Sequence, residues 1–130
     1  MSMFGILLLA QAAALPAAPA PAAPTPVDEQ IAAIGERMSA WQGGLAKVDA
    51  KLTCETKQST GDGMIDAIRC GSMLMCVGPL APQIDEIMAL DIAQREKQEQ
   101  TSGLMQTAMP CMEDYHRQAI ARLAATRAGN

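Results

Sequence analysis

Aromatic side chains and histidine are scarce in this sequence. Its 130 residues include one Phe, one Tyr, one Trp and one His, and the net charge is −4. Binding of nucleic acid requires a basic surface and often aromatic rings that stack on the bases. The composition therefore predicts no nucleic-acid partner. Because Phe4 lies in an apolar leader, the core of the remaining chain must consist of Ile, Leu, Met and Ala.

Motifs for catalysis and for cofactor attachment are also lacking. The chain has no Gly-x-Ser-x-Gly turn, no Gly-rich phosphate loop and no Cys-x-x-Cys-His haem motif. Glu113 and His116 form one Glu-x-x-His pair, but di-iron bundles need two such pairs and His116 is the only histidine. The one candidate base for Ser72 is His116, which is distant in the sequence. We therefore predict a protein that is not an enzyme, with no cofactor and no metal site.

Charge is absent from the first 27 residues. The apolar run Phe4–Leu15 is shorter than the roughly 20 residues of a transmembrane helix, and it matches the apolar core of a secretory signal, about 7–15 residues. Small residues suited to cleavage follow, so we predict a signal peptide over 1–22. The sequence does not fix the bond at which it is cleaved. No Lys or Arg precedes the run, so an apolar tail on a cytosolic protein is the alternative. We expect a periplasmic or secreted protein with no stable membrane span.

Two further regions follow from composition. Residues 15–26 are rich in Pro and Ala, which is typical of an extended, semi-stiff linker. All charged residues lie between Asp28 and Arg127, and we assign residues 27–127 to a single domain. A domain of this size has a small core, so disulfide bonds would add to its stability.

The first predicted helix carries the clearest pattern. Thr25, Pro26 and Asp28 provide an N-cap, a proline at the first helical position and an acidic residue three after the cap. Apolar residues then alternate at spacings of four and three, which predicts one apolar seam along a single long helix. We expect this seam either to pack against the protein's own helices or to bind a partner or a second copy of the chain. Its members are Val27, Ile31, Ile34, Met38, Trp41, Leu45, Val48 and Leu52.

Three more helices are predicted. The second begins near Met64 and stops at Gly78-Pro79, and the third begins near Pro82. A polar stretch over 94–102 then predicts an exposed helical tip followed by a turn at Gly103. The last helix follows a break at Pro110 and runs to about residue 125. The expected fold is all-α, a small up-down bundle of about four helices stapled by disulfides.

Four cysteines in a short chain with an export leader predict two disulfides. Helix rise in the expected bundle places Cys54 level with Cys111, which leaves Cys70 to pair with Cys76. In an unbroken helix Cys70 and Cys76 would be about 9 Å apart, beyond the reach of a disulfide, so this pairing requires a break at Gly71. The two other pairings of the four cysteines remain open.

Methionine and the single histidine suggest one competing hypothesis. Met38 and His116 could hold haem in a weak analogy to periplasmic four-helix b-type cytochromes, and sulfur-rich runs at 73–76 and 109–112 could offer thioethers to Cu(I). Methionine also fills irregular cores. The function that the sequence favours is a non-catalytic binding or structural protein, with an unknown protein partner or self-association. The alternative is a metal- or haem-binding helical bundle.

Overall fold

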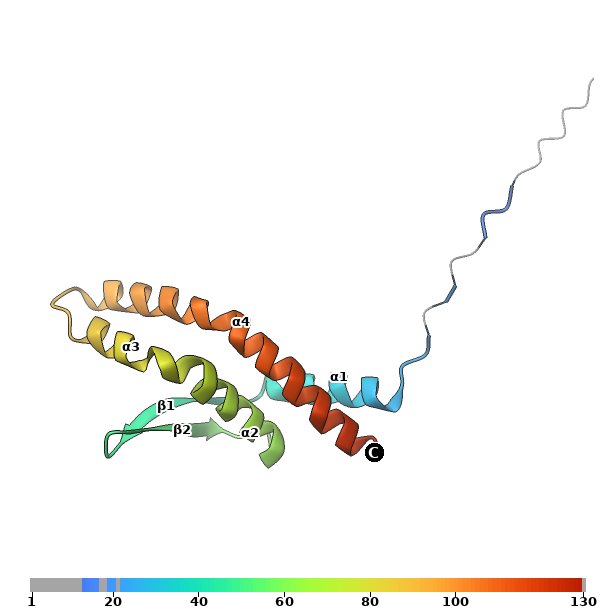
Figure 1. Ribbon diagram of the computed structural model, residues 1–130, viewed down its shortest axis with the longest axis horizontal. Helices are drawn as coiled ribbons and strands as arrows, with labels where there is room; N and C mark the ends of the chain where they lie inside the picture. The colour runs from blue at the N-terminus through green and yellow to red at the C-terminus, as the bar shows by residue number, and fades with distance from the viewer. Residues whose placement is uncertain (1–12, 17–18, 21, 130) are drawn as a thin grey trace, which may run out of the picture.

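The computed structural model describes residues 13–16, 19–20 and 22–129. The first part of the predicted signal peptide, residues 1–12, lies outside the described residues. Within them, a short helix precedes a β-hairpin, and two long helical segments follow (Figure 1). The elements are α1 Pro26–Met38, β1 Gln42–Val48, β2 Lys51–Gln58, α2 Gly63–Ser72, the π-helix Met73–Val77, the 3₁₀-helix Gly78–Leu80, α3 Ala81–Met88 and α4 Gln94–Arg127.

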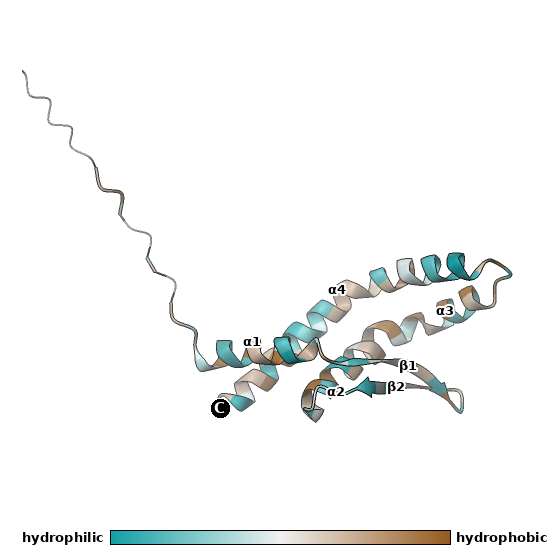
Figure 2. Cartoon of the chain, turned by 180° about the vertical axis from the view of Figure 1, so that it is seen from behind, coloured by the Kyte–Doolittle hydropathy of each residue, from teal (hydrophilic) through white to brown (hydrophobic). Residues whose placement is uncertain are grey.

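The expected all-α bundle of four helices is therefore wrong. The helical elements from α2 to α3 form one run, Gly63–Met88, which lies alongside α4 (Figure 1). The remaining elements are α1, which packs on α4, and a two-stranded antiparallel sheet. Figure 2 shows that hydrophilic residues cover the first turns of α4, whereas the run from α2 to α3 is largely apolar.

The start of α1 agrees with the prediction. The Thr25 hydroxyl accepts a hydrogen bond from the Asp28 amide at 3.2 Å, and the Asp28 carboxylate accepts one from the Thr25 amide at 3.1 Å. This reciprocal pair satisfies two amides that an α-helix leaves without partners at its first turn. Hydrogen bonding to the Asp28 carboxylate by the Thr25 backbone amide, and next by the Thr25 side chain, holds the pKa of Asp28 below its ordinary value.

The first helix was predicted to continue to Leu52 but ends at Met38, and the seam residues Leu45, Val48 and Leu52 lie in the hairpin instead. Asp49 and Ala50 both have positive φ, 50° and 63°, as in the type I′ turns that join two strands with a tight loop. Leu45 pairs with Cys54 across the strands, and Lys47 pairs with Leu52. Alternate residues of a strand lie on one face, so Leu45, Leu52 and Cys54 share the face turned toward the helices.

The glycine at position 43 is required by a close approach. A Cβ atom there would lie 2.3 Å from the Glu55 carbonyl oxygen and 2.5 Å from the Trp41 ring. Gly43 thus allows the indole to fold under the first strand, where Trp41 is only 5% exposed. Glycine weakens strands as well as helices, so the close approach, rather than strand propensity, explains Gly43.

The predicted turn at Gly103 and break at Pro110 are also wrong, because both residues lie inside α4. Proline in a helix interior removes one backbone hydrogen bond and bends the helix. Figure 1 shows this bend near the middle of α4. Next to it, Cys111 is bonded to Cys76, so the bent region is fixed to the neighbouring π-helix.

Both disulfides are present, but the favoured pairing is wrong. Cys54 is bonded to Cys70, with 5.6 Å between the Cα atoms, and Cys76 is bonded to Cys111, with 5.7 Å between theirs. The ranking from helix rise failed because Cys54 lies on a strand and because α2 continues through Gly71 without a break. One bridge fixes the hairpin to α2 and the other fixes the π-helix to α4.

The core consists of two clusters of buried side chains. The first joins α1, α2 and the end of α4, and Ile34 and Ile65 at its centre are 1% and 0% exposed. The second lies beneath the hairpin, between the π-helix and the middle of α4. Their buried members are Ile34, Met38, Ile65, Ile68, Leu123 and Ala124 in the first, and Cys76, Val77 and Ala108 in the second.

Some residues of the predicted seam are buried in or near the two clusters, and others are exposed. Ile34, Met38 and Trp41 are buried, whereas Ile31 is 38% exposed and Val48 at the hairpin tip is 50% exposed. Val27 packs against the first cluster, Leu45 packs against the second, and Leu52 is half-buried. The end of α4 therefore covers the inner side of α1.

Among the residues that the structure describes, one segment, Gly63–Met88, is long and apolar enough to cross a membrane, with a mean hydropathy of 1.3 in its most apolar window. Its Cys70 and Cys76 are bonded to β2 and α4. A core helix of a soluble protein can meet the same criterion, so this finding alone assigns no membrane span.

Candidate functional site

An apolar groove lies beneath the hairpin, with a volume of about 290 Å³. The inner face of the hairpin forms one wall, and the π-helix, α3 and the first half of α4 form the others. Such a volume is at the lower end of the range for small-molecule sites, roughly 300–1,000 Å³. The lining residues are Leu45, Ala46, Lys47, Leu52, Met73, Val77, Ala81, Ile84, Asp85 and Met105.

The strand register and a proline-bearing turn place these side chains. Leu45 and Leu52 point inward together because they lie on the same face of the hairpin. The π-helix and the 3₁₀-helix contain Gly78-Pro79, and they carry the chain from Val77 to Ala81 at the start of α3. The small side chain of Ala81 leaves space that a larger residue would fill.

The groove has one pair of charges. Lys47 on β1 forms an ion pair with Asp85 on α3, so the hairpin and α3 are joined across the groove. The two side chains are 51% and 55% exposed, which places the pair at the edge of the groove in contact with water. An exposed pair of this kind contributes little stability, about 0–1 kcal/mol. It gives the otherwise apolar groove a polar edge.

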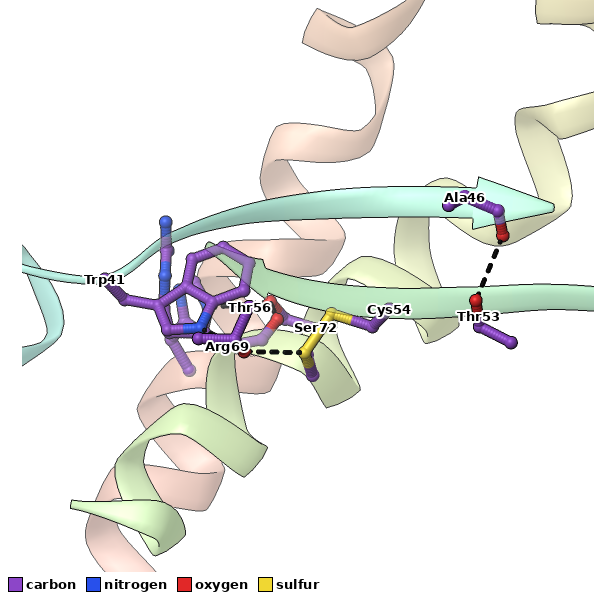
Figure 3. The surroundings of a disulfide bond; sticks show 9 residues. Trp41, Ala46, Thr53, Cys54, Thr56, Arg69 and Ser72 are labelled. Carbon is purple, nitrogen blue, oxygen red and sulfur yellow. Dashed lines mark hydrogen bonds between the residues drawn. A yellow bond between two sulfur atoms is a disulfide. The ribbon is translucent and has the colours of Figure 1, made fainter. Parts of the chain in front are cut away.

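The base of the hairpin is held by a polar cluster around the Cys54–Cys70 disulfide (Figure 3). The Trp41 indole donates a hydrogen bond to the Thr56 hydroxyl at 3.0 Å. The Arg69 guanidinium lies 5.1 Å from the centre of the Trp41 ring, within the range of a cation–π contact. Its Nε is buried and has no hydrogen-bond partner among the described residues. The cluster fixes the hairpin over α2.

Ser72 and His116 are in contact, although they are far apart in the sequence. The Ser72 hydroxyl lies 2.8 Å from His116 Nε2 and donates its own hydrogen to the Arg69 carbonyl, also at 2.8 Å. His116 Nε2 must therefore be the donor to Ser72. A catalytic base would accept a proton from serine, so this bond has the opposite direction. Ser72 is also 0% exposed, which suits a structural role.

The charge state of His116 follows from its surroundings. Burial and the nearby positive charge of Arg69 lower the pKa of His116 below its ordinary value of 6.5. The ring is therefore neutral at neutral pH, with Nε2 carrying the hydrogen that Ser72 accepts. This nitrogen is occupied and cannot bind a metal in the same arrangement.

Each residue of the metal and haem hypothesis has other contacts in the structure. Met38 lies in the first core cluster, and the described residues contain no group of three or more His, Cys, Asp or Glu side chains that could hold a metal ion. The Cys76–Cys111 bridge brings together the two sulfur-rich runs. Of their methionines, Met73 and Met112 pack against the second cluster, whereas Met75 and Met109 are exposed.

Sequence reasoning missed the groove, the ion pair at its edge and the contact of Arg69 with Trp41. The alternation of Leu52, Cys54 and Thr56 was the available signal, since a period of two is typical of a strand. No family model matches this chain, and searches of curated proteins and of solved structures found no match.

Proposed function

We propose that this protein is an exported, non-catalytic binding protein that takes an aliphatic ligand into the groove beneath its hairpin. The observation that carries the proposal is the groove itself, which combines apolar walls with a single pair of charges at its edge. Ligand pockets commonly have this composition, with apolar walls and a few polar groups that orient the ligand.

The chemistry of the walls favours a flexible aliphatic chain. Leucine, isoleucine, valine and methionine line the groove, and none of the described lining residues is aromatic. Met73 and Met105 have unbranched side chains, which adapt to ligands of different shape. An acidic head group such as a carboxylate would pair with the Lys47 ammonium at the edge in place of Asp85.

Two observations support the remaining parts of the proposal. Two disulfides in a small domain are typical of an oxidising, exported environment, and the apolar leader suggests the periplasm or the exterior. The direction of the Ser72–His116 bond supports a structural rather than a catalytic role for that pair.

Titration with a fluorescent fatty acid tests the proposal. We expect saturable binding by the parent protein and a Kd at least about tenfold higher for Ala81→Trp, a loss of about 1.4 kcal/mol or more, because the indole would fill the groove. Ala32→Trp is the matched control, since Ala32 is exposed on α1, and it should bind like the parent. Absence of binding by the parent, or equal binding by Ala81→Trp, would refute the proposed function.

A further inference from the structure

A second groove lies between α2 and the part of α4 that follows Pro110. It consists of two adjoining hollows of about 460 and 250 Å³, which share Ala119 and Arg122. All its lining residues come from α2, the π-helix and α4, and α2 packs directly on α4. This face is separate from the groove beneath the hairpin, with which it has no lining residue in common.

The exposed apolar side chains on this face lie at its two ends. Met75 lines the hollow that includes Cys111, and Met64 lines the hollow that includes Thr126. Met75 and Met64 are 64% and 60% exposed, so each leaves apolar surface in contact with water beside the groove. The small residue Ala119 lies between them and would allow a second backbone to approach closely.

The charges on this face have a self-complementary order. Asp114 and Arg122 both line the groove and lie eight residues apart on α4, about 12 Å along the helix axis. Gln118 is at the midpoint between them and also lines the groove. Within α4 its amide donates to Asp114 and accepts from Arg122, and Asp114 also pairs with Arg117, whereas Arg122 has no ion pair among the described residues. A two-fold axis at Gln118 would place Asp114 opposite the partner's Arg122, and Arg122 opposite the partner's Asp114. Isologous dimers require such a match of one surface with itself.

The same axis matches the other groups. Gln118 would meet the partner's Gln118, because each amide keeps one N–H and one lone pair beyond its bonds to Asp114 and Arg122. Met75 would lie close to the partner's Met64, because the rotation exchanges the two ends of the groove. We propose that this face binds a second copy of the chain, with the two α4 helices antiparallel across it.

Charge reversal provides a direct test by sedimentation of the full chain over a range of concentrations. Asp114→Arg and Arg122→Asp should each raise the dimer Kd by about tenfold or more, because each places like charges opposite each other twice. The double variant D114R/R122D should dimerise like the parent. An equimolar mixture of the two single variants should form heterodimers, since the charges are then opposite at both contacts.

Glu113→Arg is the matched control, because it changes the net charge as Asp114→Arg does but lies on an exposed position outside the groove lining. It should dimerise like the parent. A parent protein that stays monomeric at every concentration would overturn the proposal. So would single variants that dimerise normally, or a double variant and a mixture that both remain monomeric.

Discussion

At the scale of single residues, two glycines and one histidine explain how the chain packs so closely. Gly43 makes room for the Trp41 ring, and Gly71 makes room for Tyr115, whose hydroxyl oxygen would lie 2.1 Å from a Cβ at position 71. His116 donates to a serine that is completely buried. Sequence reasoning treated Gly71 as a break in the helix, because a missing Cβ does not reveal which side chain lies against it.

Gly71→Ala should destabilise the protein by about 1–3 kcal/mol, the usual effect of overpacking a core. Gly35→Ala on α1 is the control, because nothing lies within 4 Å of a Cβ there and alanine favours a helix by about 0.5–1 kcal/mol. Urea unfolding of both variants measures the difference. A Gly71→Ala protein as stable as the parent would show that Tyr115 does not lie against this helix.

His116 should make stability depend on pH. Its pKa is lowered in the folded state, so the neutral ring is favoured there and stability is complete above the ordinary value of 6.5. As the pH falls below 6.5 toward the folded pKa, protonation favours the unfolded chain and stability declines. His116→Gln keeps a donor for Ser72 but does not titrate, so its melting temperature should change less between about pH 7.5 and 5. Parallel pH profiles for the two proteins would contradict this assignment.

At the scale of elements, the start of α1 was predictable, whereas the end of α1, the start of α4 and the hairpin were not. The Thr25 cap depends on residues three positions apart, and this local pattern predicted the start of α1 correctly. The apolar residues from Trp41 to Leu52 follow helical spacing, yet Gly43, the Asp49–Ala50 turn and the bridge from Cys54 to α2 favour a hairpin. Pro110 remains within α4 because a helix can bend at proline while its flanks stay packed.

Ile34→Asp tests the packing of α1 on α4. Ile34 is 1% exposed within the first core cluster, so an unpaired carboxylate there should cost more than about 4 kcal/mol and unfold the protein. Ile31→Asp on the same helix is the control, since Ile31 is 38% exposed and its substitution should be tolerated. Thermal melts compare the two, and an Ile34→Asp protein that melts like the parent would contradict this packing.

The two disulfides should contribute unequally. Their cysteines are separated by 16 residues in Cys54–Cys70 and by 35 residues in Cys76–Cys111. Loop entropy predicts a loss of about 3 kcal/mol for the double Cys→Ala variant of the first pair and about 4 kcal/mol for that of the second. Urea unfolding measures both. A larger loss for the Cys54–Cys70 pair would show that this bridge stabilises the hairpin by more than chain entropy.

At the scale of the whole molecule, the fold presents two separate apolar grooves on a small stapled scaffold. The number of disulfides and the helical content could be predicted, because both depend on composition and short-range pattern. The pairing of the cysteines and the groove beneath the hairpin could not, because they depend on contacts between segments far apart in the chain. Both the cysteine pairing and the groove depend on the hairpin. It brings Cys54 next to α2 and provides one wall of the groove.

Methionine methyl NMR tests directly whether the groove beneath the hairpin binds an aliphatic ligand. Met73 and Met105 line that groove, whereas Met64 and Met75 line the face between α2 and α4. On titration with a fatty acid, we expect the methyl signals of Met73 and Met105 to shift while those of Met64 and Met75 stay in place. Shifts confined to Met64 and Met75, or no shifts at all, would contradict it.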